Sequence, residues 1–152
     1  MDGWQAEYKS KPAAQNTAAP GPTFFHIPIP EFSYFDKSNR VGVRQEPISS
    51  SLWNSGFFSS MLDDGDVKAA FVGHDHVNDF CGELEGLSLC YGGGFGYHAY
   101  GLAGWSRRAR IIVASLGREN DGTWGGVNEI RTWKRLDDNV FSTINQEVLW
   151  ST

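Results

Sequence analysis

The sequence DVKAAFVGHDHVNDFCGELEGLSLCYGGGFGYHAYG occupies residues 66–101 and holds most of the chemistry that the chain displays. Its apolar run, Val67–Val72, predicts a short buried strand because turn residues bound it on both sides. Gly73 ends that run, and His74-Asp75-His76 follows directly. Two imidazoles one residue apart at the end of a buried strand are a common way to present nitrogen ligands to a metal. We predict His74 and His76 as metal ligands; the alternative is a solvated or hydrogen-bonded loop.

A third histidine, His26, stands in a similar context upstream. It follows the short apolar run Thr23–Phe25, which predicts another strand, and Pro28 and Pro30 come soon after it. These prolines exclude a helix and a central strand, and they fix an extended exit from the strand. The order of strand, histidine and stiff loop thus occurs twice. We predict that His26 joins the metal ligands; the alternative is a capped loop histidine.

Composition restricts the class of protein. The chain has 152 residues, of which 40% are hydrophobic and 14% aromatic, which suits one small domain with a packed core. A formal net charge of −5 argues against nonspecific binding to nucleic acid and to an anionic membrane surface. No apolar run is long enough to span a bilayer. We therefore expect neither nucleic acid nor a membrane among the partners.

Residues 1–22 predict a linker or a truncated N-terminal end, and residues 23–152 the folded part. Residues 11–14 and 18–22 are rich in proline and alanine, which disfavours a helix there. The first 22 residues also lack the basic and apolar regions of a signal peptide. The location in the cell stays open: this absence favours the cytoplasm, whereas a truncated N-terminus would allow secretion or a vacuolar location.

Cys81 and Cys90 are the two cysteines of the chain. Residues 77–81 and 87–91 predict two strands joined by a turn at Glu85-Gly86, which places Cys81 opposite Cys90. A cross-strand disulfide is therefore geometrically feasible. Because the chain shows no secretion signal, we favour two buried free thiols.

The remaining elements follow from local patterns. Residues 49–62, SSSLWNSGFFSSML, predict an amphipathic helix that is capped by the serine run and has its aromatic side chains in the core. Residues 110–116, 127–136 and 140–150 predict strands, and the basic cluster 107–110 predicts a solvated edge or local ion pairs.

The run Gly92–His98, GGGFGYH, indicates backbone that passes close to a ligand, to another strand or around a bend. No Gly-Lys-Ser/Thr follows it, so it is not a nucleotide phosphate loop. His98 is a candidate for contacting a substrate or supporting a metal ligand; a structural role is the alternative.

Three separated pieces together resemble one family: FFHIPIPEF around His26, FVGHDH around His74 and His76, and YGGGFGYHAYGLAGWSRRARI after them. In this order they are similar to the C-terminal half of calcineurin-like metallophosphoesterases. The resemblance is strongest to the purple-acid-phosphatase-like proteins of plants and fungi, the Dcr2-related phosphatases among them. It extends from about residue 23 to residue 150.

This resemblance implies an α/β fold, the C-terminal half of a four-layer αββα sandwich with mixed sheets. It also implies hydrolysis of phosphomonoesters at a dinuclear site of two Fe, Zn or Mn ions. The family's lone-histidine motif corresponds to His26, and its Gly-His-x-His motif corresponds to Gly73–His76. By that correspondence His26 and His74 bind one ion and His76 binds the other, whereas Asp75 is not a ligand.

The chain departs from the family in what precedes His26. The family's first three motifs, Asp-x-His, Gly-Asp and Gly-Asn-His, precede the lone-histidine motif and supply the other ligands and the bridging aspartate, and none of them occurs before His26 in this sequence. Three imidazoles aimed at two ions without a bridging carboxylate should hold a dinuclear site poorly, with at most partial occupancy. We therefore expect a fragment of a phosphatase that is inactive by itself.

Three functions compete at this point. The first is metal-dependent hydrolysis of a phosphorylated protein or small molecule. The second is a non-catalytic remnant that binds a partner through the incomplete sheet. The third is an aromatic-rich module whose glycine loop holds a ligand without metal. Metal content separates the third from the others, and phosphatase turnover separates the first from the second.

Overall fold

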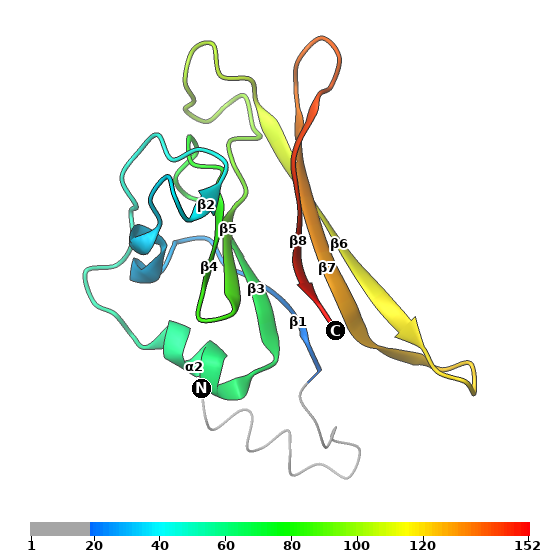
Figure 1. Cartoon of the computed structure of the whole chain (residues 1–152). Helices are drawn as coiled ribbons and strands as arrows, with labels where there is room; N and C mark the ends of the chain where they lie inside the picture. The colour runs from blue at the N-terminus through cyan, green and yellow to red at the C-terminus, as the bar shows by residue number, and fades with distance from the viewer. Residues whose placement is uncertain (1–18) are drawn as a thin grey trace.

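The computed structural model describes residues 19–152, which form two β-sheets and two short helical segments (Figure 1). The five-stranded sheet has the order β1-β3-β5-β4-β2, and the three-stranded sheet has the order β6-β7-β8. The strands are β1 (Gly21–Phe24), β2 (Arg40–Val41), β3 (Val67–Val72), β4 (Cys81–Leu84), β5 (Leu87–Tyr91), β6 (Arg108–Arg118), β7 (Trp124–Leu136) and β8 (Thr143–Ser151). The linker prediction for residues 1–18 lies outside the described residues.

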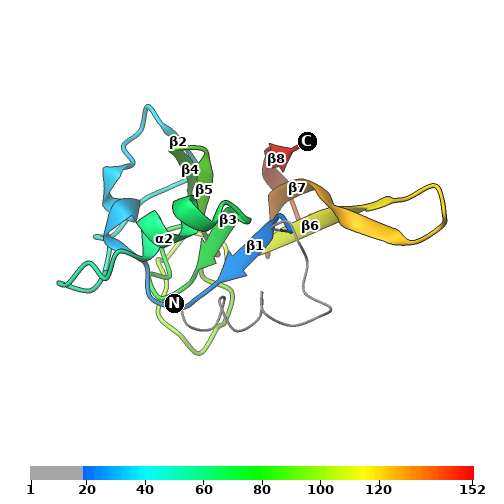
Figure 2. The ribbon, with the colours of Figure 1, turned by 90° about the horizontal axis from the view of Figure 1, so that it is seen from below.

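The elements are arranged in three layers (Figure 2). α2 (Phe57–Asp64) and the 3-10 helix η1 (Pro30–Tyr34) lie on the side of the five-stranded sheet that faces away from β6-β8. Within that sheet β1, β3 and β5 are parallel, whereas β4 and β2 are antiparallel to their neighbours. The predicted mixed, sheet-rich architecture is therefore confirmed in its coarse form.

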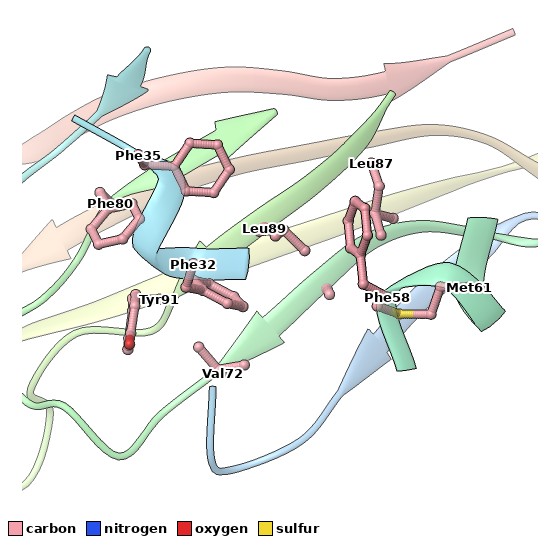
Figure 3. Close-up of a cluster of buried hydrophobic side chains, with 10 residues drawn as sticks. Phe32, Phe35, Phe58, Met61, Val72, Phe80, Leu87, Leu89 and Tyr91 are labelled. Carbon is pink, nitrogen blue, oxygen red and sulfur yellow. The ribbon is translucent and has the colours of Figure 1, made fainter. Parts of the chain in front are cut away.

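β3 is buried on both faces and has the predicted bounds. Successive side chains of a strand point to opposite faces, so Ala70 and Val72 pack toward the helices, while Ala69 and Phe71 pack toward the three-stranded sheet. The core on the helix side is mainly aromatic (Figure 3). Its other members are Phe32, Phe35, Phe58, Met61, Phe80, Leu87, Leu89 and Tyr91.

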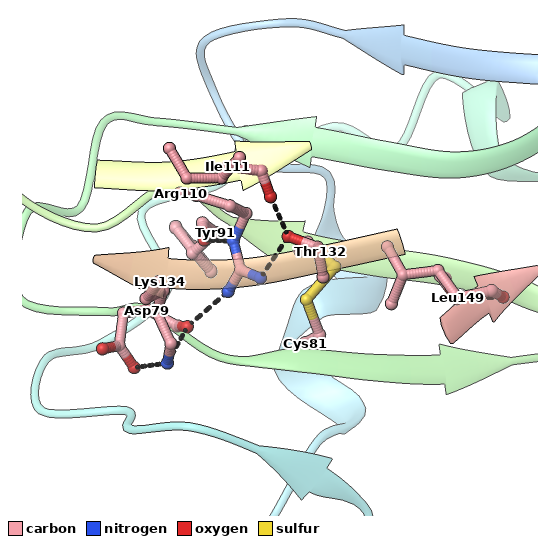
Figure 4. The surroundings of a disulfide bond; sticks show 10 residues. Asp79, Cys81, Tyr91, Arg110, Ile111, Thr132, Lys134 and Leu149 are labelled. Carbon is pink, nitrogen blue, oxygen red and sulfur yellow. Dashed lines mark hydrogen bonds and ion pairs between the residues drawn. A yellow bond between two sulfur atoms is a disulfide. The ribbon is translucent and has the colours of Figure 1, made fainter. Parts of the chain in front are cut away.

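A tight hairpin joins β4 to β5 at Glu85 and Gly86, as predicted. Both residues have positive φ angles, 51° and 79°, which the two central residues of a type I′ turn require. The turn sets the register that places Cys81 opposite Cys90, with their Cα atoms 4.1 Å apart, and the structure joins them by a disulfide (Figure 4). The preference for two free thiols is therefore wrong for this structure.

A buried ionic cluster centred on Asp79, two residues before β4, connects the two sheets. The Asp79 carboxylate lies 3.0 Å from Lys134 Nζ of β7 and 2.8 Å from Arg108 Nη1 of β6, and no side chain of the three is more than 4% exposed. The Asp79 carbonyl accepts further hydrogen bonds from Lys134 and Arg110 (Figure 4). Burial lowers the pKa of Lys134, and the Asp79 carboxylate opposes that shift. Of the two interpretations of the basic cluster, local ion pairing is confirmed.

The helix predicted over residues 49–62 is wrong at its start. α2 begins at Phe57, after Gly56 in the left-handed conformation (φ 75°). The Asn54 side chain accepts a hydrogen bond from the Gly56 N–H, which favours a turn there over a helix. Trp53, which we expected in the core with the other aromatic side chains, is 86% exposed, and its neighbour Leu52 is 99% exposed. Among the helices of residues 19–152, none has both the length and the apolar character needed to cross a membrane.

Several strands differ from their predicted bounds: β6 and β7 begin earlier than predicted, whereas β8 begins only at Thr143, and β4 occupies Cys81–Leu84 in place of the predicted 77–81. Gly125 and Gly126 lie inside β7, although the predicted strand began only at residue 127, because pairing with β6 continues past them. Gly21 and Pro22, which we placed in the linker, belong to β1. Proline is tolerated there because β1 is at the edge of its sheet.

Replacing Asp79 should be strongly destabilising. Asp79→Asn leaves Lys134 and Arg108 buried without their counter-charge, so we expect the free energy of unfolding to fall by about 3–5 kcal/mol. Glu129→Gln is the matched control, because it breaks the ion pair with Arg131, whose side chain is 51% exposed; this change should cost at most about 1 kcal/mol. Denaturant unfolding measures both variants, and equal small effects would contradict a central role for Asp79.

The disulfide predicts that the purified chain has no reactive thiol. Unfolded without reductant, the chain should not react with a thiol reagent, and reduction should lower the free energy of unfolding by about 2–3 kcal/mol, as loop closure predicts for so short a loop. In a Cys81→Ala/Cys90→Ala double variant, reductant should not change the free energy of unfolding. Two reactive thiols in the unreduced wild-type chain would refute the pairing.

Candidate metal centre

The C-terminal ends of β1, β3 and β5 lie along one edge of the five-stranded sheet because the three strands are parallel. His26 follows β1, His74 and His76 follow β3, and the glycine-rich loop 92–106 follows β5. A hydrogen bond from the Gly73 N–H to the His26 carbonyl (3.1 Å) continues the ladder just beyond the strands. Topology thus brings the predicted ligand segments to a common edge.

The imidazoles of His26 and His74 face each other. His26 Nε2 lies 3.3 Å from His74 Nδ1, and the ring planes are nearly perpendicular, at 82°. Two nitrogens bound tetrahedrally to one zinc ion at about 2.0–2.1 Å lie roughly 3.3 Å apart. The pair therefore has the spacing of two ligands of a single ion. The same distance allows a hydrogen bond between the rings when one of the two nitrogens is protonated.

A sharp turn at His74 aims this imidazole at His26. His74 adopts a left-handed conformation (φ 67°), which costs about 1–2 kcal/mol for a residue with a side chain. The Asp75 N–H donates to the Gly73 carbonyl across the turn (2.9 Å). A Cβ at Gly73 would lie only 3.2 Å from His26 Nδ1, so the glycine lets the two segments approach. Strain of this kind persists where the surrounding structure over-determines the turn.

Asp75, between the two histidines of the motif, supplies such support from the interior. Its side chain is 2% exposed, and its Oδ2 accepts hydrogen bonds from the Tyr91 hydroxyl (2.6 Å) and the Ser49 N–H (3.0 Å). Burial, reinforced by the Asp75 carboxylate, raises the pKa of Tyr91 far above its usual range, so Tyr91 stays a donor. Asp75 therefore anchors the histidine loop to the core.

His76 lies against Tyr100 of the glycine-rich loop. The two rings stack with centroids 4.2 Å apart and planes 7° from parallel. The His76 N–H donates to the Tyr100 hydroxyl (2.9 Å), and His76 Nδ1 lies 3.2 Å from the Tyr100 carbonyl oxygen. Within residues 19–152 no hydrogen bond engages His76 Nε2.

Glu46 binds both Tyr100 and the backbone next to His76, although the sequence indicated no function for its segment. The Tyr100 hydroxyl donates to Glu46 Oε2 (2.9 Å), and the Val77 N–H donates to Glu46 Oε1 (2.7 Å). Burial raises the pKa of Tyr100, and the Glu46 carboxylate contributes in the same direction. Sequence reasoning missed both Glu46 and Tyr100; the glycine-rich run signalled a close approach but drew attention to His98.

His98 lies apart from the other histidines. Its side chain is exposed, and it lines a cavity of about 510 Å³ with residues that include Phe95, Arg135 and Phe141. Among the described residues, its imidazole has no hydrogen bond or ring contact with another histidine. The role of His98 at a substrate or behind a ligand stays a prediction.

The glycine-rich loop passes close to the histidine loop, as its glycine density predicts. A Cβ at Gly94 would lie 2.7 Å from the His76 carbonyl oxygen. A Cβ at Gly101 would lie 2.6 Å from Arg107 Cζ, and Arg107 donates hydrogen bonds to the carbonyls of Tyr100 (2.8 Å) and Ala99 (2.7 Å). The close approach of the loop to the His76 backbone and to the Arg107 side chain therefore explains why residues 94 and 101 are glycines.

The donor set fits a metal in part. Imidazole nitrogens suit zinc, iron and manganese, and the His26–His74 pair has the spacing of two ligands. Residues 19–152, however, contain no group of three or more His, Cys, Asp or Glu side chains placed to hold an ion. The neighbouring carboxylates of Glu46 and Asp75 already accept hydrogen bonds. A dinuclear centre therefore needs ligands beyond those that the described residues bring together.

Comparison with known proteins decides the family. Over 146 residues, or 95% of the chain, it is 60% identical to probable inactive purple acid phosphatase 29 of Arabidopsis thaliana. It is 52% identical to probable inactive purple acid phosphatase 14 of the same plant over 97% of the chain, and 34% identical to phosphatase DCR2 of Saccharomyces cerevisiae over 75%. The chain is a homologue of one part of the purple-acid-phosphatase-like proteins.

The match covers only part of these relatives. The chain spans 38%, 37% and 20% of their respective lengths. The predicted resemblance is confirmed, for a C-terminal part of a purple-acid-phosphatase-like protein only. No family model matches the chain, and no solved structure matches it significantly.

The tight packing of the glycine-rich loop on His76 can be tested with two alanine substitutions. Gly94→Ala places a methyl group against the His76 carbonyl, so we expect the free energy of unfolding to fall by about 1–3 kcal/mol. Gly96→Ala is the control, because a Cβ there would meet no atom within 4 Å, and its effect should stay within about 0.5 kcal/mol. Thermal or denaturant unfolding measures both, and equal effects would refute the close approach.

Proposed function

We propose that this chain is the part of a purple-acid-phosphatase-like phosphoesterase that contributes His26, His74 and His76 to a dinuclear metal site. Residues outside the chain complete the site, and the chain by itself does not turn over substrate. The substrates would be phosphomonoesters, on a protein or a small molecule. Metal ions held there would supply Lewis acidity and stabilise charge on the phosphoryl group.

The approach of His26 and His74 is the observation that carries this proposal. Two residues that are distant in sequence present ring nitrogens 3.3 Å apart at the ends of adjacent parallel strands. A backbone turn with a positive φ angle at His74 maintains that geometry at a cost. A pair of core or surface histidines needs neither feature. Imidazole is neutral when unprotonated, so the pair suits Fe, Zn and Mn alike.

An exposed sheet edge and an open cavity support the second half of the proposal. β1 is an edge strand, and beside it a cavity of about 440 Å³ opens between the sheets, lined in part by Phe24, Phe71 and Ile112. Phe24 is 63% exposed although it stacks on Phe71. We propose that residues 23–152 are the C-terminal part of a four-layer αββα sandwich, in which the rest of the protein covers this cavity and the outer face of β6-β8.

A second candidate is a non-catalytic, partner-binding fragment. The two Arabidopsis relatives are named probable inactive purple acid phosphatases, whereas the yeast relative is named a phosphatase. The exposed edge of β1 and the apolar cavity beside it are features that favour association. This candidate keeps the fold and the histidine pair but forgoes hydrolysis.

Metal titration of the chain and its variants tests the site. We expect calorimetry with Zn²⁺ or Mn²⁺ to show binding that weakens at least about tenfold in His26→Ala and in His74→Ala, since each change removes one of the two paired ligands. His98→Ala is the matched control and should bind as the wild type does. Equal affinity in all variants would refute the assignment and favour a glycine-loop binding module without metal.

Hydrolysis of p-nitrophenyl phosphate tests completeness separately. At every metal loading the isolated chain should show no turnover above buffer, because residues 19–152 bring no group of three or more ligands, carboxylates included, together to hold an ion. Turnover that disappears in His74→Ala would mean that the site is complete in this chain, and the second half of the proposal would fail.

A further inference from the structure

Tyr100 contacts His76 through three different groups. Its ring stacks on the imidazole at 4.2 Å, its hydroxyl accepts the His76 N–H (2.9 Å), and its carbonyl oxygen lies 3.2 Å from His76 Nδ1. Side-chain packing alone would need only the first of these contacts. Together they fix the position and the tilt of the imidazole, and they determine that Nδ1 is the ring nitrogen that faces Tyr100.

The carbonyl contact selects one tautomer. A carbonyl oxygen only accepts hydrogen bonds, so the contact with Nδ1 is favourable when Nδ1 carries the proton. The lone pair of a neutral imidazole then resides on Nε2, which within the described residues has no hydrogen-bond partner. A metal-ligating histidine commonly has this arrangement, with its other ring N–H donated to a backbone carbonyl.

Two charged side chains hold Tyr100 in place. The Tyr100 hydroxyl donates to Glu46, and Glu46 is itself fixed by the Val77 N–H (2.7 Å). On the other side, Arg107 donates to the Tyr100 carbonyl (2.8 Å) and to the neighbouring Ala99 carbonyl (2.7 Å). Arg107 and His76 thus take one lone pair each of the same carbonyl oxygen.

His26 and His74, the other two histidines at this edge of the sheet, differ from His76 in the contacts of their ring nitrogens. Within residues 19–152, the ring nitrogens of His26 and His74 make a hydrogen-bonding contact only with each other. Either tautomer satisfies that contact, provided that one nitrogen donates and the other accepts. His76 is therefore the histidine whose tautomer the fold selects.

We infer that Tyr100, supported by Glu46 and Arg107, is a positioning residue that holds His76 in the Nδ1-protonated tautomer and leaves Nε2 free as the donor nitrogen. The use of Nε2 as a metal ligand rests on the proposed function; the tautomer itself does not. Tyr100 acts through His76 and need not touch the substrate.

Nitrogen NMR of the metal-free chain tests this inference. With four histidines in the chain, long-range ¹⁵N–¹H spectra resolve each ring, and His76→Gln identifies the signals of His76. The spectra are recorded at about pH 8.5, at which a free imidazole is neutral. We expect the protonated nitrogen of wild-type His76 to be Nδ1, whereas exposed His98 should show a tautomer mixture.

Variants separate positioning from packing. Tyr100→Ala should give His76 a mixture of the two tautomers that resembles the mixture of His98. Tyr100→Phe keeps the ring but loses the hydrogen bond to Glu46, so the tautomer ratio of His76 should move part of the way toward that mixture. Tyr97→Phe is the matched control: it removes a hydroxyl from the same loop that bonds Asp137 and should leave His76 unchanged.

A wild-type His76 protonated at Nε2, or mixed to the same extent as His98, would overturn the inference even if every variant unfolded. An unchanged tautomer in folded Tyr100→Ala would overturn it as well. The NMR experiment uses the metal-free chain. A failure of metal binding in the titration would therefore refute the proposed function without affecting the tautomer result.

Discussion

The Asp79 carboxylate lies between two buried cations and connects the three-stranded sheet to the loop that carries His74 and His76. Lys134 and Arg108 reach it from β7 and β6, and the Val43 N–H is a third donor to the same carboxylate, at 2.7 Å. A buried charge is costly to desolvate unless partners satisfy it, so these groups hold one another in a single arrangement. The packing of the sheets and the position of the histidine loop therefore share one anchor.

A polar framework extends from that anchor to the edge of the sheet. Asn78, next to Asp79, accepts the backbone N–H groups of Gln45 and Glu46 with its Oδ1. Asp75 is tied to Tyr91 in the core. These residues are nearly all buried, so each must find its hydrogen-bond partners within the protein. The result is a rigid loop, on which a left-handed His74 can be maintained against its intrinsic cost.

On the proposed function, these hydrogen bonds explain how one part of a larger protein keeps its share of a site. The histidines are positioned by contacts within residues 19–152, whereas further ligands are not found there. The relatives that the chain resembles are more than twice as long, since the chain spans 38% of the first of them. On the proposed function, residues outside the chain both supply the remaining ligands to the three histidines and cover the open cavity beside β1.

Local patterns in the sequence were sufficient for the elements that depend on near neighbours. The apolar run of β3, the turn at Glu85-Gly86 and the register opposing Cys81 and Cys90 follow from strand alternation and turn geometry, and the family follows from three motifs in order. The start of α2 was mispredicted because the Asn54 turn competes with a helix over the same residues. The pairing of His26 with His74 and the roles of Glu46, Asp79 and Tyr100 required the tertiary structure. Their contacts join segments far apart in the chain, and which side chains meet there depends on sheet order and on the satisfaction of buried charge, neither of which a local pattern encodes.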